Sequence, residues 1–258
     1  MILTSDYHTH TIFSHGKGDV LENALVAKEK GLKQLGITDH GFSHPAFGLR
    51  NRKLPKLKVL CKQASEQTGV EVLCGIESNV ICENGKTDLT PDKYDHFDLF
   101  LAGMHKCILF KPKSMFTLGI PNVFYSTFKI ENPPKRLFKS NTKAFVNVIK
   151  KNPVDVITHL NYCCYSDAVE IAKVASDYGT YLELSSKKTH LSDEEILKIL
   201  DTGVNFVINS DAHTPDRVGD KTLAESLVKR LNIPEERIHN INGKSPNFRF
   251  KAFKEKNL

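Results

Sequence analysis

Residues 5–16 contain three histidines, His8, His10 and His15. His8 and His10 lie two positions apart, so in an extended segment their side chains project from the same face and can bind one ion. Asp211 and His213 repeat this spacing near the end of the chain. Neutral imidazole and carboxylate are the ordinary ligands of zinc and also suit manganese and iron. The spacing therefore indicates metal chemistry that draws on both ends of the chain.

Residue types that bind metals recur after seven short apolar runs, each of which predicts a buried strand. The runs are residues 2–3, 35–38, 70–76, 99–102, 154–157, 181–184 and 206–208. The polar residues at their carboxyl ends are, in order, His8 and His10, Asp39 and His40, Glu77, His105, His159, Glu183, and Asp211 with His213. With His15, these positions hold seven of the eleven histidines, a concentration that random scatter does not explain well.

Amphipathic segments of helical period lie between the runs and predict helices over residues 21–30, 54–68, 143–151, 167–178, 193–202 and 223–231. Alternating apolar strands and helices predict an α/β fold with a parallel sheet, either open or closed into a barrel. We favour the barrel, because the carboxyl ends of its strands meet at one face and would gather the polar side chains around one centre. An open sheet would spread them along a line.

Nine residues are candidate metal ligands: His8, His10, His15, His40, Glu77, His105, His159, Asp211 and His213. This number exceeds the needs of one ion, so we expect two or three divalent ions with at least one bridging carboxylate. No cysteine belongs to the set, which favours a catalytic over a structural site.

The composition restricts the class of protein. The 258 residues, 40% of them hydrophobic, can form a large core, and we expect one domain over residues 1–258. The sequence shows neither an export signal nor an apolar stretch approaching the roughly 18 residues of a membrane span, and its six cysteines form no Cys-x-x-Cys pair. We therefore expect a soluble cytoplasmic protein with no membrane partner. The net charge of +6 favours anionic ligands.

The polar motifs, taken in order, resemble those of the PHP (polymerase and histidinol phosphatase) superfamily from about residue 5 to residue 220. The resemblance is carried by residues 6–10 with His15, and by residues 37–40, 75–77, 103–105, 157–159 and 209–213. It implies a distorted seven-stranded (β/α)7 TIM-like barrel with a trinuclear metal centre. One ion would take His8, His10, Glu77 and Asp211, a second would share Glu77 and take His105 and His159, and a third would take His15, His40 and His213.

This ligand set suits the hydrolysis of phosphate esters. Two neighbouring divalent ions lower the pKa of a bridging water and hold hydroxide for attack on phosphorus, so Glu77 and Asp211 are expected to be catalytic. Asp39, next to His40, would either orient a ligand or donate a proton to the leaving group. Arg217, near the last metal motif, is the first candidate for binding substrate phosphate. Arg50 and Lys187 are further candidates, for which a solvated surface charge is the simpler alternative.

Residues 106–142 form a long insertion before the helix predicted to begin near Lys143, and they contain four prolines, several aromatic residues and many lysines. Such a segment could be a lid over the metals, a surface that binds nucleic acid, or a disordered loop.

Three functions remain open. The first is a phosphatase acting on a small phosphorylated metabolite, with histidinol phosphate as one substrate that the resemblance suggests. The second is a nuclease or phosphodiesterase acting on nucleic-acid ends, and the third is a non-catalytic metal-binding module. The lack of a recognisable second catalytic domain favours the first, and the complete ligand set disfavours the third.

Overall fold

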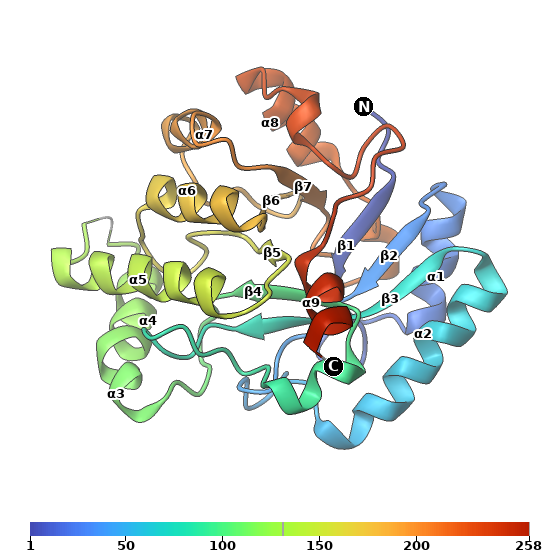
Figure 1. Ribbon diagram of the computed structural model, residues 1–258, viewed down its shortest axis with the longest axis horizontal. Helices are drawn as coiled ribbons and strands as arrows, with labels where there is room; N and C mark the ends of the chain where they lie inside the picture. Colours follow the sequence, from blue (N-terminus) through green and yellow to red (C-terminus); the bar gives the residue numbers. More distant parts are fainter. Residues whose placement is uncertain (131, 258) are drawn as a thin grey trace.

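The computed structural model describes residues 1–130 and 132–257, in which seven parallel strands curve into a nearly closed barrel with helices outside it (Figure 1). The strands are β1 (Ser5–Thr9), β2 (Gln34–Ile37), β3 (Glu71–Asn79), β4 (Leu99–Gly103), β5 (Val156–Ile157), β6 (Tyr181–Ser185) and β7 (Phe206–Asn209). Consecutive strands pair in parallel from β1 to β7. The α/β barrel expected from the sequence is therefore confirmed.

Helices cover the outside of the barrel. The α-helices are α1 (Val20–Glu29), α2 (Leu54–Thr68), α3 (Pro112–Ser114), α4 (Ile120–Thr127), α5 (Lys135–Lys151), α6 (Ala168–Tyr178), α7 (Asp193–Leu200), α8 (Thr222–Leu231) and α9 (Arg249–Asn257). Short 3₁₀ or π turns are η1 (Asn51–Lys53), η2 (Pro91–His96), η3 (Met115–Gly119), η4 (Pro215–Arg217) and η5 (Glu235–Arg237). Capping boxes at Asp19 and Ser192 begin α1 and α7, and Gly69 and Gly179, both at positive φ, end α2 and α6. None of the helices within the described residues has both the length and the apolar character that crossing a bilayer would need.

The first strand differs from the prediction. The apolar run at residues 2–3 is not a strand of the barrel, and Leu3 instead forms an isolated antiparallel bridge with Ile241. The actual strand, β1, carries Asp6 and His8, whose side chains are fully buried. An apolar run is a poor guide here because β1 supplies polar groups to the end of the barrel as well as side chains to its core.

The barrel closes only partly between β1 and β7, since the chain around Asn240 lies between their amino-terminal halves. The side-chain amide of Asn240 donates to Ser5 O (2.8 Å) and Ile208 O (2.6 Å), and its oxygen accepts from Ile208 N (2.9 Å). At the other end the strands meet directly, where His10 N donates to Ala212 O at 2.8 Å. This segment therefore separates part of β1 from β7.

Asn240→Ala is expected to lower the free energy of unfolding by about 3 kcal/mol, because three backbone groups of the buried seam lose their partner. Urea unfolding followed by circular dichroism measures the loss. Asn51→Ala, at an exposed position whose side chain forms no hydrogen bond among the described residues, is the control and should change stability by less than about 0.5 kcal/mol. Equal stability of the two variants would contradict this account of the seam.

Apolar side chains fill the amino-terminal half of the barrel. Tyr7, Leu99, Leu101, Val156, Tyr181 and Val207 form one buried cluster, against which Leu73 and Phe248 pack. Phe248 precedes α9, and its ring meets that of Tyr7 edge to face at 4.8 Å between centroids. In Figure 1, α9 lies at the centre of the view in front of the strands. The carboxyl end of the barrel is thus the end left open for polar chemistry.

The insertion at residues 106–142 is not an unstructured loop in its described part, and that alternative is wrong. It contains α3, η3 and α4, and α5 begins at Lys135, earlier than the predicted start near Lys143. The helices are joined by a buried amide pair in which Asn122 and Asn141 donate to each other at 2.7 and 2.9 Å. Residue 131, inside the predicted insertion, lies outside the described residues.

Candidate metal centre

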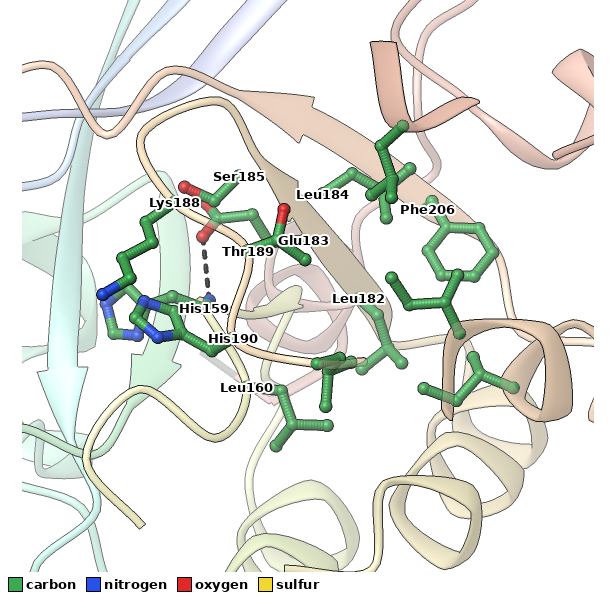
Figure 2. Close-up of a pocket in the computed structure, with 14 residues that line it drawn as sticks. His159, Leu160, Leu182, Glu183, Leu184, Ser185, Lys188, Thr189, His190 and Phe206 are labelled. Carbon is green, nitrogen blue, oxygen red and sulfur yellow. Dashed lines mark hydrogen bonds between the residues drawn. The ribbon is translucent and has the colours of Figure 1, made fainter. Parts of the chain in front are cut away.

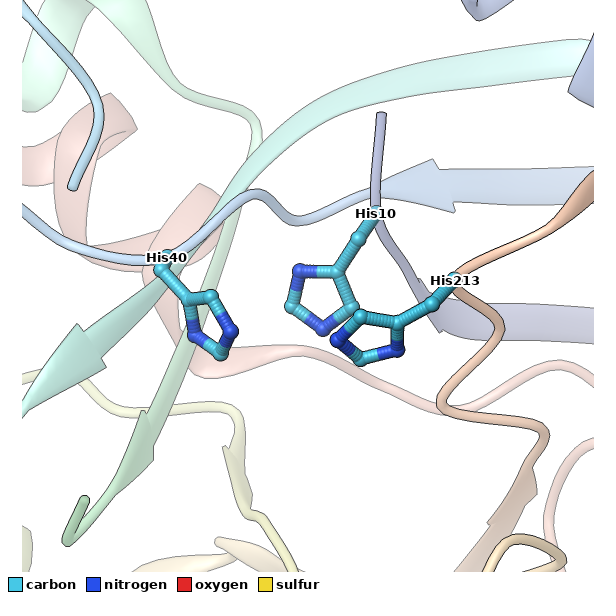
Figure 3. Close-up of side chains that lie close together, drawn as sticks. All are labelled: His10, His40 and His213. Atoms are coloured by element: carbon cyan, nitrogen blue, oxygen red, sulfur yellow. The ribbon is translucent and has the colours of Figure 1, made fainter. Parts of the chain in front are cut away.

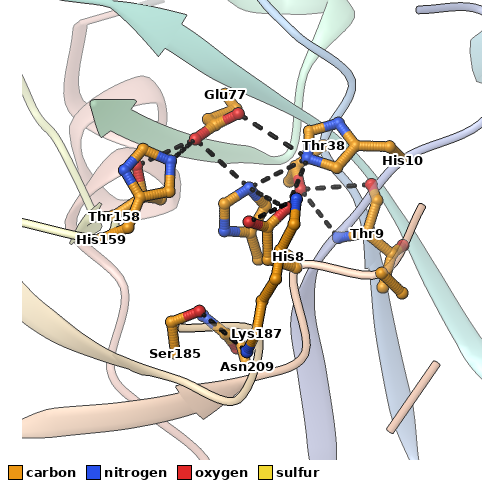
Figure 4. Close-up of polar contacts among 12 residues, drawn as sticks. His8, Thr9, His10, Thr38, Glu77, Thr158, His159, Ser185, Lys187 and Asn209 are labelled. Carbon is orange, nitrogen blue, oxygen red and sulfur yellow. Dashed lines mark hydrogen bonds and ion pairs between the residues drawn. The ribbon is translucent and has the colours of Figure 1, made fainter. Parts of the chain in front are cut away.

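Glu77, near the carboxyl end of β3, lies at the centre of the open end of the barrel and is fully buried. Its Oε1 is 2.7 Å from His159 Nε2, 3.1 Å from His105 Nε2 and 3.3 Å from His8 Nε2. Its other oxygen, Oε2, is 2.8 Å from His40 Nδ1. Figure 4 shows His8 and His159 directed toward this carboxylate from different strands. Four imidazoles thus converge on Glu77 from separate parts of the chain.

Asp211 extends this arrangement toward β7. His10 Nε2 lies 3.2 Å from Asp211 Oδ1 and 3.1 Å from His8 Nε2, and His8 Nε2 lies 3.8 Å from Asp211 Oδ1. Three groups of donor atoms, each within 4.8 Å of one another, adjoin in this region: His8 with His10 and Asp211, His8 with Glu77 and His159, and His40 with Glu77 and His105.

A further group joins His10, His40 and His213 (Figure 3). The resemblance implied a set of His15, His40 and His213, and in the structure these three rings lie together with the ring of His10 beside them. The ring of His15 stacks on that of His40 at 4.8 Å between centroids, but the exposed His15 belongs to none of the described donor groups. His15 lies in the turn after β1, and its ring is also 4.2 Å from that of His213 between centroids, so it remains beside this group.

The residues present fit divalent metal ions. Four of the donor side chains have a buried atom without a hydrogen bond in the described structure: His10 Nδ1, Glu77 Oε2, His105 Nε2 and His159 Nδ1. Buried polar atoms are normally satisfied, so unpaired atoms concentrated in one cluster indicate a missing partner. Burial alone would raise the pKa of Glu77, but the charges of His105, His8 and His159 hold it well below its usual range. An ionised carboxylate among nitrogen donors is a set that zinc, manganese or iron accepts.

Outer hydrogen bonds orient the imidazoles. His8 Nδ1 lies 2.7 Å from Glu183 Oε1, and Glu183 Oε2 accepts from His159 N at 2.8 Å. A small cavity of about 30 Å³ adjoins Glu183, lined largely by apolar side chains such as Leu182 and Phe206 (Figure 2). The apolar side chains of this cavity offer Glu183 no polar partner. Its carboxylate instead contacts His8 on β1 and the backbone after β5, and so fixes the orientation of the His8 ring.

A second outer partner, Asn79, was missed by the sequence reasoning. His105 Nδ1 lies 2.7 Å from Asn79 Oδ1, and Asn79 Nδ2 donates to Asp88 Oδ2 at 2.7 Å. Asn79 could have been identified from the sequence, because it lies two residues after Glu77 in the same strand and its side chain therefore projects from the same face.

Asp39 lies behind the donors rather than among them. Its buried carboxylate accepts from Thr11 N at 2.8 Å, Thr11 Oγ1 at 2.6 Å and Ser14 Oγ at 2.5 Å, and it does not line the pocket at the centre. Of the two alternatives for this residue, the geometry favours orientation of the segment between His10 and His15 over proton donation to a leaving group.

The donors open into a pocket of about 610 Å³. It is lined by His15, His40, His44, Ala46, Phe47, His105, Lys106, Cys107, His159, Tyr162, Ser185, Lys187, Lys188, His190, Asp211 and His213. Lys187 places its Nζ 3.1 Å from Asp211 Oδ2 and 3.1 Å from His213 Nδ1.

Two of the cations proposed to bind substrate are not brought to this pocket. Arg217 pairs with Asp220 at 2.9 Å and donates to Ser186 O, and Arg50 donates to Pro45 O. Neither side chain lines the pocket. Closeness in sequence to a metal motif is a weak guide here, because both arginines are held by carbonyl or carboxylate groups away from the pocket. Lys187, for which a solvated charge was the simpler alternative, is the one that reaches the donors.

Glu183→Gln is expected to reduce metal affinity or catalytic activity by about 10-fold to 100-fold, the usual cost of losing a partner that orients a ligand. The amide keeps the shape of the side chain but cannot hold His8 and the backbone amide of His159 with a charge. Metal titration and steady-state kinetics measure the two quantities. Glu170→Gln, on the exposed start of α6, is the matched control, and an equal response of both variants would contradict the role of Glu183.

Comparisons with known proteins agree with this geometry. The family model described as PHP domain matches residues 6–187. A protein named probable phosphatase from Caldanaerobacter subterraneus subsp. tengcongensis is 31% identical over 249 residues, covering 92% of this chain and 87% of its own. Another of that name, from Thermoanaerobacter sp. strain X514, is 32% identical over 258 residues and covers 93% and 91%.

Solved structures share the barrel. The histidinol phosphate phosphatase of Lactococcus lactis, complexed with zinc, L-histidinol and phosphate, superposes with a TM-score of 0.61 at 16% identity, over 90% of this chain and 94% of that one. A Listeria monocytogenes protein described as a histidinol phosphatase gives 0.62 at 14% identity, over 83% and 97%. At these identities the likeness concerns the fold.

Proposed function

The chain belongs to the PHP domain family and is a metal-dependent phosphatase, and on this premise we propose that its substrate is a monoester of a small phosphorylated metabolite. The family resemblance expected from the motifs is confirmed by the match over residues 6–187. The observation that carries the proposal is the convergence of imidazoles and a second carboxylate, Asp211, around Glu77 at the open end of the barrel.

The donor groups indicate which residues would hold divalent ions. His8, His10, Glu77 and Asp211 would hold one ion, and Glu77 with His105 and His159 would hold another. Because His10 is assigned to the first ion, a third position would use His40 and His213 with His15, whose ring lies 4.8 and 4.2 Å from theirs, so we propose two or three ions. Zinc is one candidate, since the Lactococcus lactis structure contains it, and manganese and iron suit the same donors. When bound, such ions supply Lewis acidity toward phosphoryl oxygens and lower the pKa of water to about 7.

The protein's own groups prepare this chemistry. Glu183 and Asn79 fix the rings of His8 and His105, so the donors are held in place before substrate arrives. The ammonium group of Lys187 lies beside Asp211 and His213, and there it would bind oxygens of the phosphoryl group and stabilise charge that develops during transfer. Phe47 and Tyr162 line the pocket and provide apolar surface for the organic part of an ester.

The proposal is tested on protein loaded with manganese or zinc. We expect hydrolysis of para-nitrophenyl phosphate, much slower hydrolysis of bis(para-nitrophenyl) phosphate, and no shortening of an end-labelled oligonucleotide. Activity confined to the diester or the oligonucleotide would replace this proposal with a nuclease or phosphodiesterase. Well-folded protein that binds no metal would overturn both.

A screen of phosphorylated metabolites, with histidinol phosphate among them, would then identify the natural substrate.

A further inference from the structure

Two lysines that have no partner within residues 1–130 and 132–257 line the pocket beside the candidate metal ligands. Lys106 follows β4 and Lys188 follows β6, and both belong to the wall of the pocket of about 610 Å³. Among the described residues, neither forms an ion pair or a side-chain hydrogen bond, whereas Lys187 contacts Asp211 and His213. Figure 2 shows Lys188 extending toward the same side as His159 and His190. Their ammonium groups are therefore free to meet a ligand.

The charge of the pocket wall is unbalanced. Asp211 is the only carboxylate among the described lining residues, and it already contacts His10 and Lys187. The wall thus offers Lys106 and Lys188 no negative charge of its own. A concave site lined by one sign of charge concentrates its field and attracts ligands of the opposite sign.

The pocket is also larger than a phosphoryl group requires. Its volume of about 610 Å³ lies within the roughly 300–1,000 Å³ range of sites that enclose whole small molecules. Tyr162 spans the space between the loops that carry the two lysines, since its ring lies 6.1 Å from that of His105 and 5.1 Å from that of His190. A substrate whose phosphate lies at the donors can therefore extend along Tyr162 toward Lys106 and Lys188.

We propose that Lys106 and Lys188 bind a second anionic group of the substrate, so that the preferred substrate is a phosphomonoester carrying another phosphate or a carboxylate. The inference rests on the proposed function for the phosphate that is cleaved. The proposed subsite also disfavours an ester with an ammonium group in that position, because the described residues of the pocket wall offer no carboxylate besides Asp211 to receive it.

The test uses four esters with one three-carbon skeleton: propyl phosphate, 3-aminopropyl phosphate, 3-phosphonooxypropanoate and propane-1,3-diyl bisphosphate. For the metal-loaded wild-type enzyme, we expect kcat/KM to be at least about 10-fold higher for the preferred ester with a second anionic group than for propyl phosphate, the size of one or two charge-assisted contacts. The 3-aminopropyl ester should be the poorest. The two anionic esters show whether the second group is a phosphate or a carboxylate.

In the double variant Lys106→Met with Lys188→Met, the ratio of kcat/KM between the anionic ester and propyl phosphate should fall to about one. Lys173→Met, on the exposed face of α6, should keep the wild-type ratio. A ratio near one in the wild-type enzyme, or a wild-type ratio in the double variant, overturns the subsite.

Calorimetric binding of propylphosphonate and 3-phosphonopropanoate, which cannot be hydrolysed at phosphorus, separates this inference from the proposed function. A second anion that tightens binding at least about 10-fold in wild-type protein and not in the double variant supports the subsite even if no ester is turned over. In that case the proposed function fails and the subsite stands. If the esters are hydrolysed but a second anionic group gives no such preference, the proposed function stands and the subsite fails.

Discussion

Glu77→Gln is expected to lower kcat/KM for para-nitrophenyl phosphate by far more than 100-fold and to reduce the metal content of the purified protein. Loss of a residue that merely orients a ligand costs about 10-fold to 100-fold, and Glu77 contacts four imidazoles of the centre directly. The neutral amide removes the negative charge that two neighbouring cations would share. Steady-state kinetics and elemental analysis of the variant measure both effects.

Glu29→Gln, on the exposed end of α1, changes the same chemical group away from the centre and should leave both quantities unchanged. Thermal unfolding of Glu77→Gln must show a folded protein before its kinetics are interpreted. A folded variant with wild-type metal content and activity would mean that Glu77 is only a buried polar residue.

Removal of the metal is the second change with a large expected effect. Dialysis against a strong chelator should abolish activity, and replacement of manganese or zinc should restore it. The same treatment should lower the melting temperature by about 10 °C, since ligand at 1,000 times its Kd stabilises the native state by about 4 kcal/mol and each kcal/mol moves the melting temperature by about 2–4 °C in a domain of this size. Activity assays and scanning calorimetry on the same samples provide the two measurements.

The Glu77→Gln protein supplies an internal comparison for this experiment. If the stabilisation comes from ions held at the donor cluster, the chelator should shift the melting temperature of that variant much less than that of the wild type. An equal shift in both proteins would place the stabilising ion elsewhere. Full activity in the chelator would remove the basis for metal-dependent catalysis.

The fold and the composition of the site could be predicted from the sequence because both depend on residue type and local order. Alternating apolar runs and amphipathic segments require parallel strands covered by helices. Residues at the carboxyl ends of such strands share one face, which is why His8, His40, Glu77, His159 and Asp211 could be grouped although they lie far apart along the chain.

The errors have a common cause, which is that polar contacts override local pattern. Strand β1 is polar, and it is buried only because Asp6 bonds to Ser210 and Gly219 while His8 bonds to Glu183. Each of these contacts joins residues more than 170 positions apart, at |i−j| of 204, 213 and 175. The insertion that precedes and begins α5 likewise holds a long-range polar contact, the amide pair between Asn122 and Asn141.

The sequence by itself determined the barrel class, the family and the residue types available to bind metal. The tertiary structure alone decided which of these side chains lie together, with His10 and His15 both beside His40 and His213. It also directed Lys187 to the donors while Arg50 and Arg217 bond elsewhere. Residue type and strand order can be read from the sequence. The orientation of each side chain depends on hydrogen-bond partners that are distant in the sequence and come close only when the chain folds.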